Sequence, residues 1–242
     1  MTTVAEPVYR SDMTVELVRS AAGDADVVWS ARVSTQGEQS LAAVDEDPTA
    51  SAGLIGFLLR NRHGTPFEHN SMTFLVSAPI FVFREFQRHR IGWSYNEESG
   101  RYRELQPTFY VPGADRPLAQ TGKPGAYDFI DAGPELTDLA VDCTTRAYRA
   151  AYASYQEMLA AGVAREIARV VLPVGIYSSM YATCNARSLM AFLSLRTKDE
   201  NSRFPSYPQR EIEMVAEQME AHFAALMPLT HAAFVEAGRV CP

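Results

Sequence analysis

The chain has 242 residues, of which 47% are hydrophobic and 21% charged, a balance that is ordinary for a globular protein. Its formal net charge of −7 argues against nonspecific binding to nucleic acid, which needs a basic surface. The longest mostly apolar stretch, residues 72–83, is too short to cross a bilayer, and the N-terminus lacks the apolar run of a signal peptide. The three cysteines are far apart and form neither a disulfide framework nor a zinc pattern, which favours a reducing cytoplasm. We therefore expect neither a nucleic-acid partner nor a membrane partner.

Helix and strand patterns alternate along the first half of the chain. Pro48 and Pro79 each stand where a helix begins, which suits the fixed backbone angle of proline. The Gly, Ser and Asn content of residues 91–100 predicts a loop. The predicted elements are a strand at 14–17, helices over 24–34 and 48–61, a strand over 71–77 and a helix over 80–89.

The second half of the chain is more helical. Residues 104–133 are rich in Pro and Gly and predict one short strand, at 108–111, followed by a surface excursion. Asn185 is a natural N-cap for the helix after it. The other predicted elements are helices over 134–161 and 165–171, a strand over 176–183 and helices over 186–195 and 209–226. We expect a single α+β domain over residues 1–242, with a central, largely antiparallel sheet flanked by helices.

Arginine gathers in two short stretches that eight residues separate. Arginine is seldom fully buried without a partner, and its planar fork suits phosphate or carboxylate. Cations at a helix C-terminus also stabilise the helix dipole, so the first stretch by itself has a structural explanation as well. The second stretch adds a hydroxyl and a glycine that permits close backbone approach, and together these suit a phosphate. The stretches are Arg88-His89-Arg90 and Ser99-Gly100-Arg101-Tyr102-Arg103.

A second block, from His63 to His69, holds two histidines and Glu68 around a Pro-containing turn. These residue types ligate metals, but the turn keeps them off any regular element, and no Cys or third His is near. We predict no metal and interpret the block as a structural or ligand-contacting turn. A metal-dependent nucleotide hydrolase built on these three side chains is kept as a rival hypothesis.

The stretch from Arg88 to Arg103, RHRIGWSYNEESGRYR, resembles the signature of the flavin-dependent thymidylate synthases. That family converts dUMP to dTMP with 5,10-methylenetetrahydrofolate as carbon donor, FAD as redox carrier and NADPH as reductant, and it releases tetrahydrofolate. The segments Thr65–His69 and Asn185–Arg187 also resemble family segments, so the resemblance runs from about residue 31 to residue 212. It implies a cytoplasmic homotetramer that binds dUMP, methylenetetrahydrofolate and NADPH at active sites between subunits.

The resemblance also implies roles for individual residues. Arg196 would be catalytic by stabilising negative charge on the activated pyrimidine, and His63 would act near the flavin. The FAD-binding residues would be Ser34, Thr65, Arg88, His89, Arg90, Glu97, Asn185 and Arg187. The dUMP-binding residues would be Glu85, Arg88, Glu97, Glu98, Ser99, Gly100, Arg101, Arg169 and Arg196.

Arg187 and Arg196 are nine residues apart, which is about 900° around a helix and places them on opposite faces. One arginine in solvent and one in a pocket would fit this spacing, and so would two ligand sites.

The sequence departs from the family pattern at several places. Eight residues rather than the usual seven separate Arg90 from Ser99, and Trp93 looks like the extra one. Ala191 stands where the family often has Asn, and Glu85 where Gln is frequent. Residues 199–208 depart most from the family pattern. A non-catalytic nucleotide-binding or sensor protein on the same fold is therefore the alternative.

Familiar nucleotide-binding and nucleophile motifs are missing. The chain has no GxGxxG after a strand and no GxxxxGK[ST], so neither a Rossmann site nor a P-loop is predicted. Scattered side chains must then hold FAD, and a neighbouring subunit would help to enclose it. None of Cys143, Cys184 and Cys241 has an obvious base partner, so we expect no thiolate nucleophile.

Overall fold

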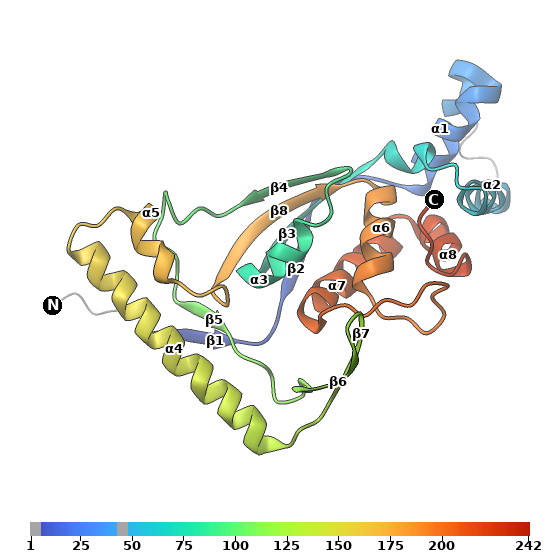
Figure 1. Ribbon diagram of the computed structural model, residues 1–242. Coiled ribbons are helices and arrows are strands. Elements are labelled where there is room, and N and C mark those ends of the chain that lie inside the picture. Colours follow the sequence, from blue (N-terminus) through green and yellow to red (C-terminus); the bar gives the residue numbers. More distant parts are fainter. Residues whose placement is uncertain (1–5, 43–47) are drawn as a thin grey trace. The chain divides into compact units, whose positions relative to one another are not determined.

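The computed structural model describes residues 6–42 and 48–242 (Figure 1). The chain divides into two compact units, and each is described by itself. Within the described residues, unit 1 comprises residues 6–14, 77–88 and 96–180, and unit 2 comprises residues 15–42, 48–76, 89–95 and 181–242. A single domain over residues 1–242 stays a prediction, and residues 1–5 and 43–47 of it lie outside the described residues.

The main sheet contains an antiparallel pair of strands, β3 and β8, and two hydrogen bonds between their ends define the direction. Thr73 meets Thr183 near one end of β3 and β8, and just past the other end the Ile80 N–H donates to the Ile176 carbonyl. The two strands therefore run in opposite directions. This mixed α and β architecture with an antiparallel sheet and helices confirms the predicted fold class. The strand order is β2 (Thr14–Ala21), β3 (Ser71–Pro79), β8 (Tyr177–Cys184) and β4 (Trp93–Glu97).

The core of unit 1 forms around one face of its longest helix. Tyr148, Tyr152 and Tyr155 recur at helical spacing on α4 and are buried. Phe109 of β5 stacks on Tyr148, with ring centroids 4.7 Å apart. The elements of the unit include β1 (Val8–Arg10), which pairs in parallel with β5 (Thr108–Tyr110), α3 (Ile80–Phe86), α4 (Pro134–Ala160), α5 (Arg165–Ala168) and η3 (Arg169–Val171).

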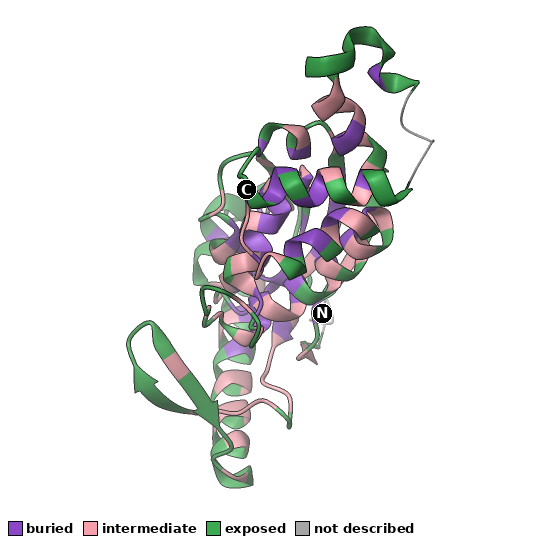
Figure 2. Ribbon diagram, turned by 90° about the vertical axis from the view of Figure 1, so that its right-hand side faces the viewer, coloured by how far each residue is buried: buried purple, intermediate pink, exposed green. Residues whose placement is uncertain are grey.

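The excursion predicted after residue 111 contains a β-hairpin. Strands β6 (Ala119–Lys123) and β7 (Ala126–Ile130) pair antiparallel. Most of the hairpin is exposed, as the green strands in Figure 2 show. Composition did not predict these strands, because Gly, Lys and Gln carry little strand signal.

Unit 2 is a helical assembly with an apolar interior. Asn185 caps α6 by accepting a hydrogen bond from the Ser188 N–H at 2.9 Å, which confirms the predicted N-cap. Buried side chains such as Leu189, Val215 and Phe223 fill the interior. The helical elements are α1 (Asp24–Gln36), η1 (Gly37–Leu41), α2 (Pro48–Arg60), η2 (Thr65–Glu68), α6 (Ala186–Arg196), α7 (Arg210–Leu226) and α8 (Pro228–Glu236).

Two element predictions need correction. The predicted loop over 91–100 is wrong, because Trp93–Glu97 forms β4, in which aromatic side chains alternate with polar ones. The predicted helix over 80–89 ends earlier, at Phe86, so Arg88, His89 and Arg90 follow α3 instead of ending it. No helix of the part of the chain that the structure describes is both long and apolar enough to span a membrane.

Candidate active site

In unit 2 the end of α6 meets the first arginine stretch. Arg196, the last residue of α6, donates from Nε to Nε2 of His89 at 3.0 Å. His89 accepts this bond, so in this arrangement its ring carries the proton on Nδ1 and is neutral. The sequence separates the two residues by 107 positions, and no local pattern predicts their pairing.

Aromatic rings surround this His89–Arg196 pair. Phe192, one turn before Arg196, packs edge-on against the His89 ring at 4.9 Å. Trp93 stacks on Tyr95 at 5.6 Å and also contacts Phe192. The Tyr95 hydroxyl donates to the His89 carbonyl at 2.8 Å, and burial raises the pKa of that hydroxyl. Phe192 thus packs against the imidazole, and the Tyr95 hydroxyl holds the backbone at His89.

Arg187, at the other end of α6, borders a cavity of about 500 Å³ in unit 2. Its guanidinium pairs with the Glu68 carboxylate through Nη1, and its Nε donates to the Pro242 carbonyl at 2.9 Å. Asn185 and Arg62 also border the cavity. Arg187 and Arg196 thus contact different partners, as their helical spacing predicts.

Two glycines allow the chain to approach this cavity closely. A Cβ on Gly64 would lie 2.5 Å from the Arg187 guanidinium. Gly92 has a positive φ of 68°, and a Cβ there would collide with the Ser188 hydroxyl. That hydroxyl donates to the Ile91 carbonyl at 2.9 Å, which ties the first arginine stretch to α6. Neither glycine tolerates a side chain without displacing residues that border the cavity.

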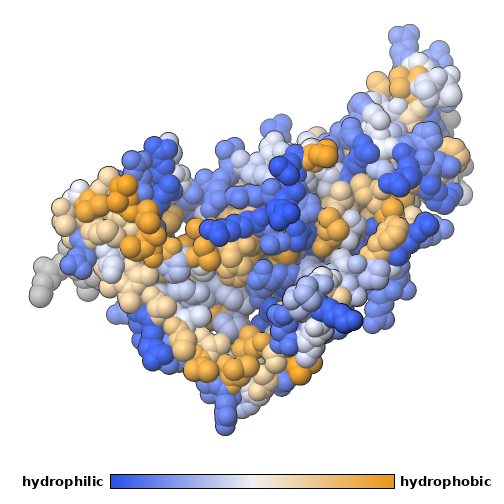
Figure 3. Space-filling view, in the orientation of Figure 1, coloured by the Kyte–Doolittle hydropathy of each residue, from blue (hydrophilic) through white to orange (hydrophobic). Residues whose placement is uncertain are grey.

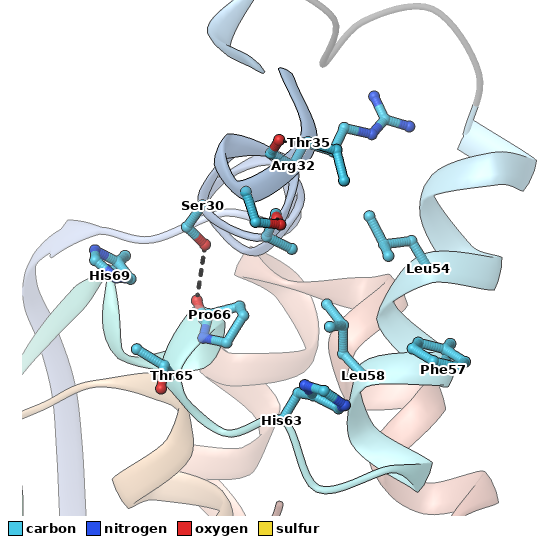
Figure 4. A pocket seen from close by; sticks show the side chains of 12 residues that line it. Ser30, Arg32, Thr35, Leu54, Phe57, Leu58, His63, Thr65, Pro66 and His69 are labelled. Atoms are coloured by element: carbon cyan, nitrogen blue, oxygen red, sulfur yellow. Dashed lines mark hydrogen bonds between the residues drawn. The ribbon is translucent and has the colours of Figure 1, made fainter. Parts of the chain in front are cut away.

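A second cavity of unit 2, of about 460 Å³, lies between α1, α2 and η2 (Figure 4). Ser34 of α1 lines it together with His63 and Thr65, which belong to the turn after α2. His63 stacks on Phe57 with ring centroids 6.0 Å apart. The Ser34 hydroxyl donates to the carbonyl of Ala31 within its own helix. The structure therefore brings together three residues for which the sequence predicted a flavin role.

In unit 1 the second arginine stretch forms a turn. The N–H groups of Tyr102 and Arg103 donate to the Ser99 carbonyl, and the Arg101 N–H donates to the Ser99 hydroxyl at 3.3 Å. Gly100 is buried, and a Cβ there would press on Leu105 and on Arg169, at 3.1 and 3.2 Å. Arg101 pairs with Glu166 at 3.1 Å, and both side chains are about half exposed.

Glu97 and Glu98 have different partners in unit 1. Glu98 pairs with Arg103 at 3.0 Å, and its N–H donates to the Ser179 carbonyl. The pKa of Glu97 is raised, first by the loss of water around the carboxyl and then by the Glu98 charge, although Ser178 and Arg169 pull it down. The Ser178 hydroxyl that acts on Glu97 is itself buried.

The remaining predicted residues lie near these two groups. Glu85 belongs to α3, and its carbonyl accepts a bond from the Arg88 N–H at 3.3 Å. Arg88 and Arg90 are exposed. The candidate residues thus fall into two sets, one in each unit. Unit 1 holds Glu85, Arg88, Glu97, Glu98, Ser99, Gly100, Arg101 and Arg169, and unit 2 holds Ser34, His63, Thr65, His89, Arg90, Asn185, Arg187 and Arg196.

The contacts of Glu68, His69 and the cysteines bear on the metal and thiolate alternatives. Glu68 pairs with Arg187, and His69 lies edge-on to Trp29. Over residues 6–42 and 48–242, no three metal-ligating side chains gather into a group that could hold an ion. Burial raises the pKa of the Cys184 thiol, and burial also raises that of Cys241 despite the nearby Arg187.

Sequence reasoning did not identify two features of the site. The sequence suggests Glu68 only as a metal ligand, whereas in the structure it pairs with Arg187, which lies 119 positions away in the chain. Trp93 and Tyr95 were placed in a loop, although their alternation with polar residues was the available signal for a strand.

Comparison with known proteins places the chain in a family. The family model described as thymidylate synthase complementing protein matches residues 16–229. The flavin-dependent thymidylate synthase of Streptomyces coelicolor is 68% identical over 233 residues, which cover 96% of this chain and 95% of the relative. That of Tropheryma whipplei is 56% identical over 239 residues, which cover 99% of each chain.

Solved structures agree with the sequence relatives. A crystal structure of the UMP/dUMP methylase PolB from Streptomyces cacaoi bound with 5-Br dUMP superposes with a TM-score of 0.92 at 57% identity, covering 97% of this chain and 100% of that one. The complex of PolB with 5-Br UMP gives a TM-score of 0.91 at 55% identity, covering 98% and 100%. Because the family model matches most of the sequence and named members align over nearly all of it, this chain belongs to the flavin-dependent thymidylate synthase family.

Proposed function

We propose that this protein converts dUMP to dTMP, with 5,10-methylenetetrahydrofolate as carbon donor, FAD as cofactor and NADPH as reductant. The observation that carries the proposal is the 68% identity to a relative named flavin-dependent thymidylate synthase, across 96% of the chain. The alternative of a non-catalytic nucleotide-binding protein is not favoured, because relatives with this name match 96% and 99% of the chain. We also propose the cytoplasm as its location.

The donors in unit 2 fit an elongated anionic cofactor. The cavity beside Arg187 offers guanidinium and amide donors, and Gly64 and Gly92 leave room for close backbone approach. The cavity that Figure 4 shows adds hydroxyl and imidazole groups from Ser34, Thr65 and His63. We assign FAD to these residues, together with Arg88, His89, Arg90, Glu97 and Asn185. The chemistry that FAD supplies when bound is the transfer of reducing equivalents that originate in NADPH.

The chain's own residues supply position and charge. Arg196 brings a permanent positive charge to the pyrimidine, where negative charge develops as the ring is activated. His89 and the aromatic rings around it hold that guanidinium in place. In unit 1, Arg101 and Arg169 would hold nucleotide oxygens. Ser99 and Gly100 shape the turn that leads into Arg101, and Gly100 packs against Arg169. Glu85, Arg88, Glu97 and Glu98 complete the proposed dUMP-binding set.

One assay tests the reaction. The purified protein should be yellow, and anaerobic incubation with dUMP, methylenetetrahydrofolate and NADPH should yield dTMP and tetrahydrofolate, measured by chromatography. A protein that binds flavin and dUMP but yields no dTMP would support the non-catalytic alternative. A colourless protein would contradict the cofactor assignment.

A second substrate should be tested in the same assay, because the solved relative, PolB, is described as a UMP/dUMP methylase in both of its complexes. UMP would be methylated at the same ring carbon if the site accepts the ribose 2′-hydroxyl. We expect dUMP to be the better substrate, since the curated relatives carry the thymidylate synthase name. A higher kcat/KM for UMP would reassign the substrate without changing the chemistry.

We further propose that the protein is a homotetramer with active sites between subunits. Unit 1 exposes an apolar surface around α5 and η3, where Figure 3 shows orange atoms gathered. Its members are Val163, Ile167, Val170, Val171 and Val174, each at least 36% exposed. Contiguous apolar surface of this kind is typical of an interface. Light scattering on the purified protein would give the subunit number.

A further inference from the structure

The residue that follows Arg196 is held at each of its polar atoms. The Thr197 N–H donates to the Leu193 carbonyl at 3.1 Å, and its hydroxyl donates to the same carbonyl at 2.7 Å. The Thr197 carbonyl accepts a bond from the Ser206 hydroxyl. Thr197 is only 5% exposed. The end of α6 is therefore fixed at a point where helices commonly fray.

Arg239, near the C-terminus, makes the remaining bond to Thr197. Its Nη2 donates to the Thr197 hydroxyl oxygen at 2.7 Å, and its two terminal nitrogens bind Glu220 as a fork, each at 2.7 Å. His231 also contacts Glu220, at 2.9 Å. The Arg239 side chain is 5% exposed, so water replaces none of these bonds easily. One buried guanidinium thus links α7, through Glu220, to the residue after Arg196.

The backbone around Arg239 is strained and ties down the loop after α6. Arg239 itself has a positive φ of 59°, which is unfavourable for a residue with a side chain and persists only where the surroundings enforce it. The carbonyl of Gly238 accepts a bond from the Arg203 N–H at 2.9 Å. Arg203 belongs to residues 199–208, the stretch that departs most from the family pattern. The same turn therefore holds both the helix end and this loop.

We propose that Arg239 is a positioning residue for Arg196 and acts through the Thr197 hydroxyl. The inference rests on the proposed function, because the position of Arg196 matters for turnover only if Arg196 contacts the pyrimidine. Thr197 is bonded directly to Arg196 in the chain, so a fixed Thr197 limits how far the Arg196 backbone moves. The guanidinium is thereby kept within 3.0 Å of His89.

A matched pair of isosteric variants tests the proposal. Thr197→Val removes the hydroxyl that Arg239 contacts, whereas Thr230→Val removes another buried hydroxyl of unit 2, one that belongs to α8 and donates to Asp24 at 2.6 Å. We expect Thr197→Val to lower kcat roughly tenfold, with FAD content and KM for dUMP within about twofold of wild type. We expect Thr197→Val and Thr230→Val to lower Tm by similar amounts. Thr230→Val should nevertheless leave kcat within about twofold of wild type.

Arg239→Lys provides the conservative comparison. Lysine keeps the charge beside Glu220 but has a single nitrogen, which lacks the fork that contacts Glu220 and Thr197 together. We expect a kcat between those of wild type and Thr197→Val. Arg239→Ala is unsuitable, because it leaves Glu220 buried without its main partner and unfolding would mask any effect on turnover.

A spectroscopic measurement separates this proposal from the proposed function. The Nε–H of Arg196, assigned by its loss in Arg196→Lys, should exchange slowly with solvent in wild type because it donates to His89. It should exchange several-fold faster in Thr197→Val than in Thr230→Val. Equal exchange rates, or an equal kcat in the two valine variants, would overturn the positioning role. A wild-type protein that forms no dTMP would instead contradict the proposed function, while the exchange rates still decide the role of Arg239.

Discussion

At the scale of single residues, two of the arginines proposed to bind ligands are already paired with carboxylates of the protein. Arg101 pairs with Glu166, and Arg187 pairs with Glu68. All four side chains are between 39% and 53% exposed. Exposed ion pairs contribute only about 0.2–1 kcal/mol, so an incoming phosphate can displace these carboxylates at small cost. The carboxylates keep each guanidinium in place and compete weakly with the ligand.

This competition gives a prediction for Glu166. Glu166→Gln removes the charge that competes for Arg101, so dUMP should bind about 1.5- to 5-fold more tightly, the range that an exposed ion pair allows. Titration calorimetry on the flavin-loaded protein measures the change. Asp142→Asn, which breaks another exposed arginine pair of unit 1, is the matched control and should leave dUMP affinity unchanged. Weaker binding in Glu166→Gln would mean that Glu166 positions Arg101 for the nucleotide.

At the scale of elements, local signals predicted the starts of helices well. Asn185 caps α6 as its side chain predicts, and Pro48, Pro79 and Pro134 each stand at a helix start or directly before it. The strand β4 was missed because Gly92 and Ser94 suggested a loop more strongly than the alternating aromatics suggested a strand. Helix α8 was not predicted, and Pro228, at the start of α8 one residue after the C-cap of α7, was the available signal for it.

The candidate site was predictable in residue type but not in pairing. The resemblance of the signature to the family predicts that His89 and Arg101 contact ligands. Their partners Arg196 and Glu166 lie 107 and 65 positions away, and only the tertiary fold brings such residues together. One sequence contains no signal for contacts at this separation.

Gly92 gives a prediction at this scale, because it joins the first arginine stretch to β4. A Cβ on Gly92 would collide with Ser188 and approach Asn185 to 3.1 Å, whereas a Cβ on Gly125 would meet nothing within 4 Å. Both glycines have positive φ, so alanine at either position costs roughly 1–2 kcal/mol of backbone strain. Gly92→Ala should lose about 1–3 kcal/mol more than Gly125→Ala and should also lose FAD on gel filtration. Equal FAD content in the two variants would remove this turn from the cofactor site.

At the scale of the whole molecule, the Glu220–Arg239 pair makes the free energy of unfolding depend on pH. Burial by itself raises the pKa of Glu220, but hydrogen bonds and charges from His231 and Arg239 outweigh it and lower the pKa from 4.5 to about 2. A lowered carboxyl pKa stabilises the fold above pH 4.5, and this stabilisation is lost as the pH falls from 4.5 towards 2. Its size is on the order of 3 kcal/mol.

Glu220→Gln should therefore be less stable than wild type at pH 7, and the difference should shrink between pH 5 and pH 3. The free energy of unfolding from urea titrations measures it at each pH. Glu217→Gln, which removes an exposed glutamate from the same helix, should leave a curve close to that of wild type. A difference between Glu220→Gln and wild type that stays constant with pH would show that Glu220 is not ionised in its ion pair.

The candidate residues also make a prediction about assembly. Arg101 lies in unit 1 and Arg196 in unit 2, and both are proposed to bind dUMP. If each active site takes these two arginines from different subunits, a mixed oligomer can contain complete sites even when every subunit is defective. If one subunit supplies both arginines, no mixed oligomer contains a complete site.

Arg101→Ala and Arg196→Ala should each be nearly inactive while remaining yellow, because neither change removes a residue of unit 2 that is proposed to contact the flavin. Arg196→Ala should still accept reducing equivalents from NADPH, since that step needs no activation of the pyrimidine. When the two variants are unfolded together and refolded at equal concentration, random assembly should restore roughly a quarter of wild-type dTMP formation if the sites are shared. The two variants refolded separately and then mixed are the control and should remain inactive. Failure to recover activity in mixed oligomers, with their assembly shown by differently tagged subunits, would place Arg101 and Arg196 of each site in the same subunit.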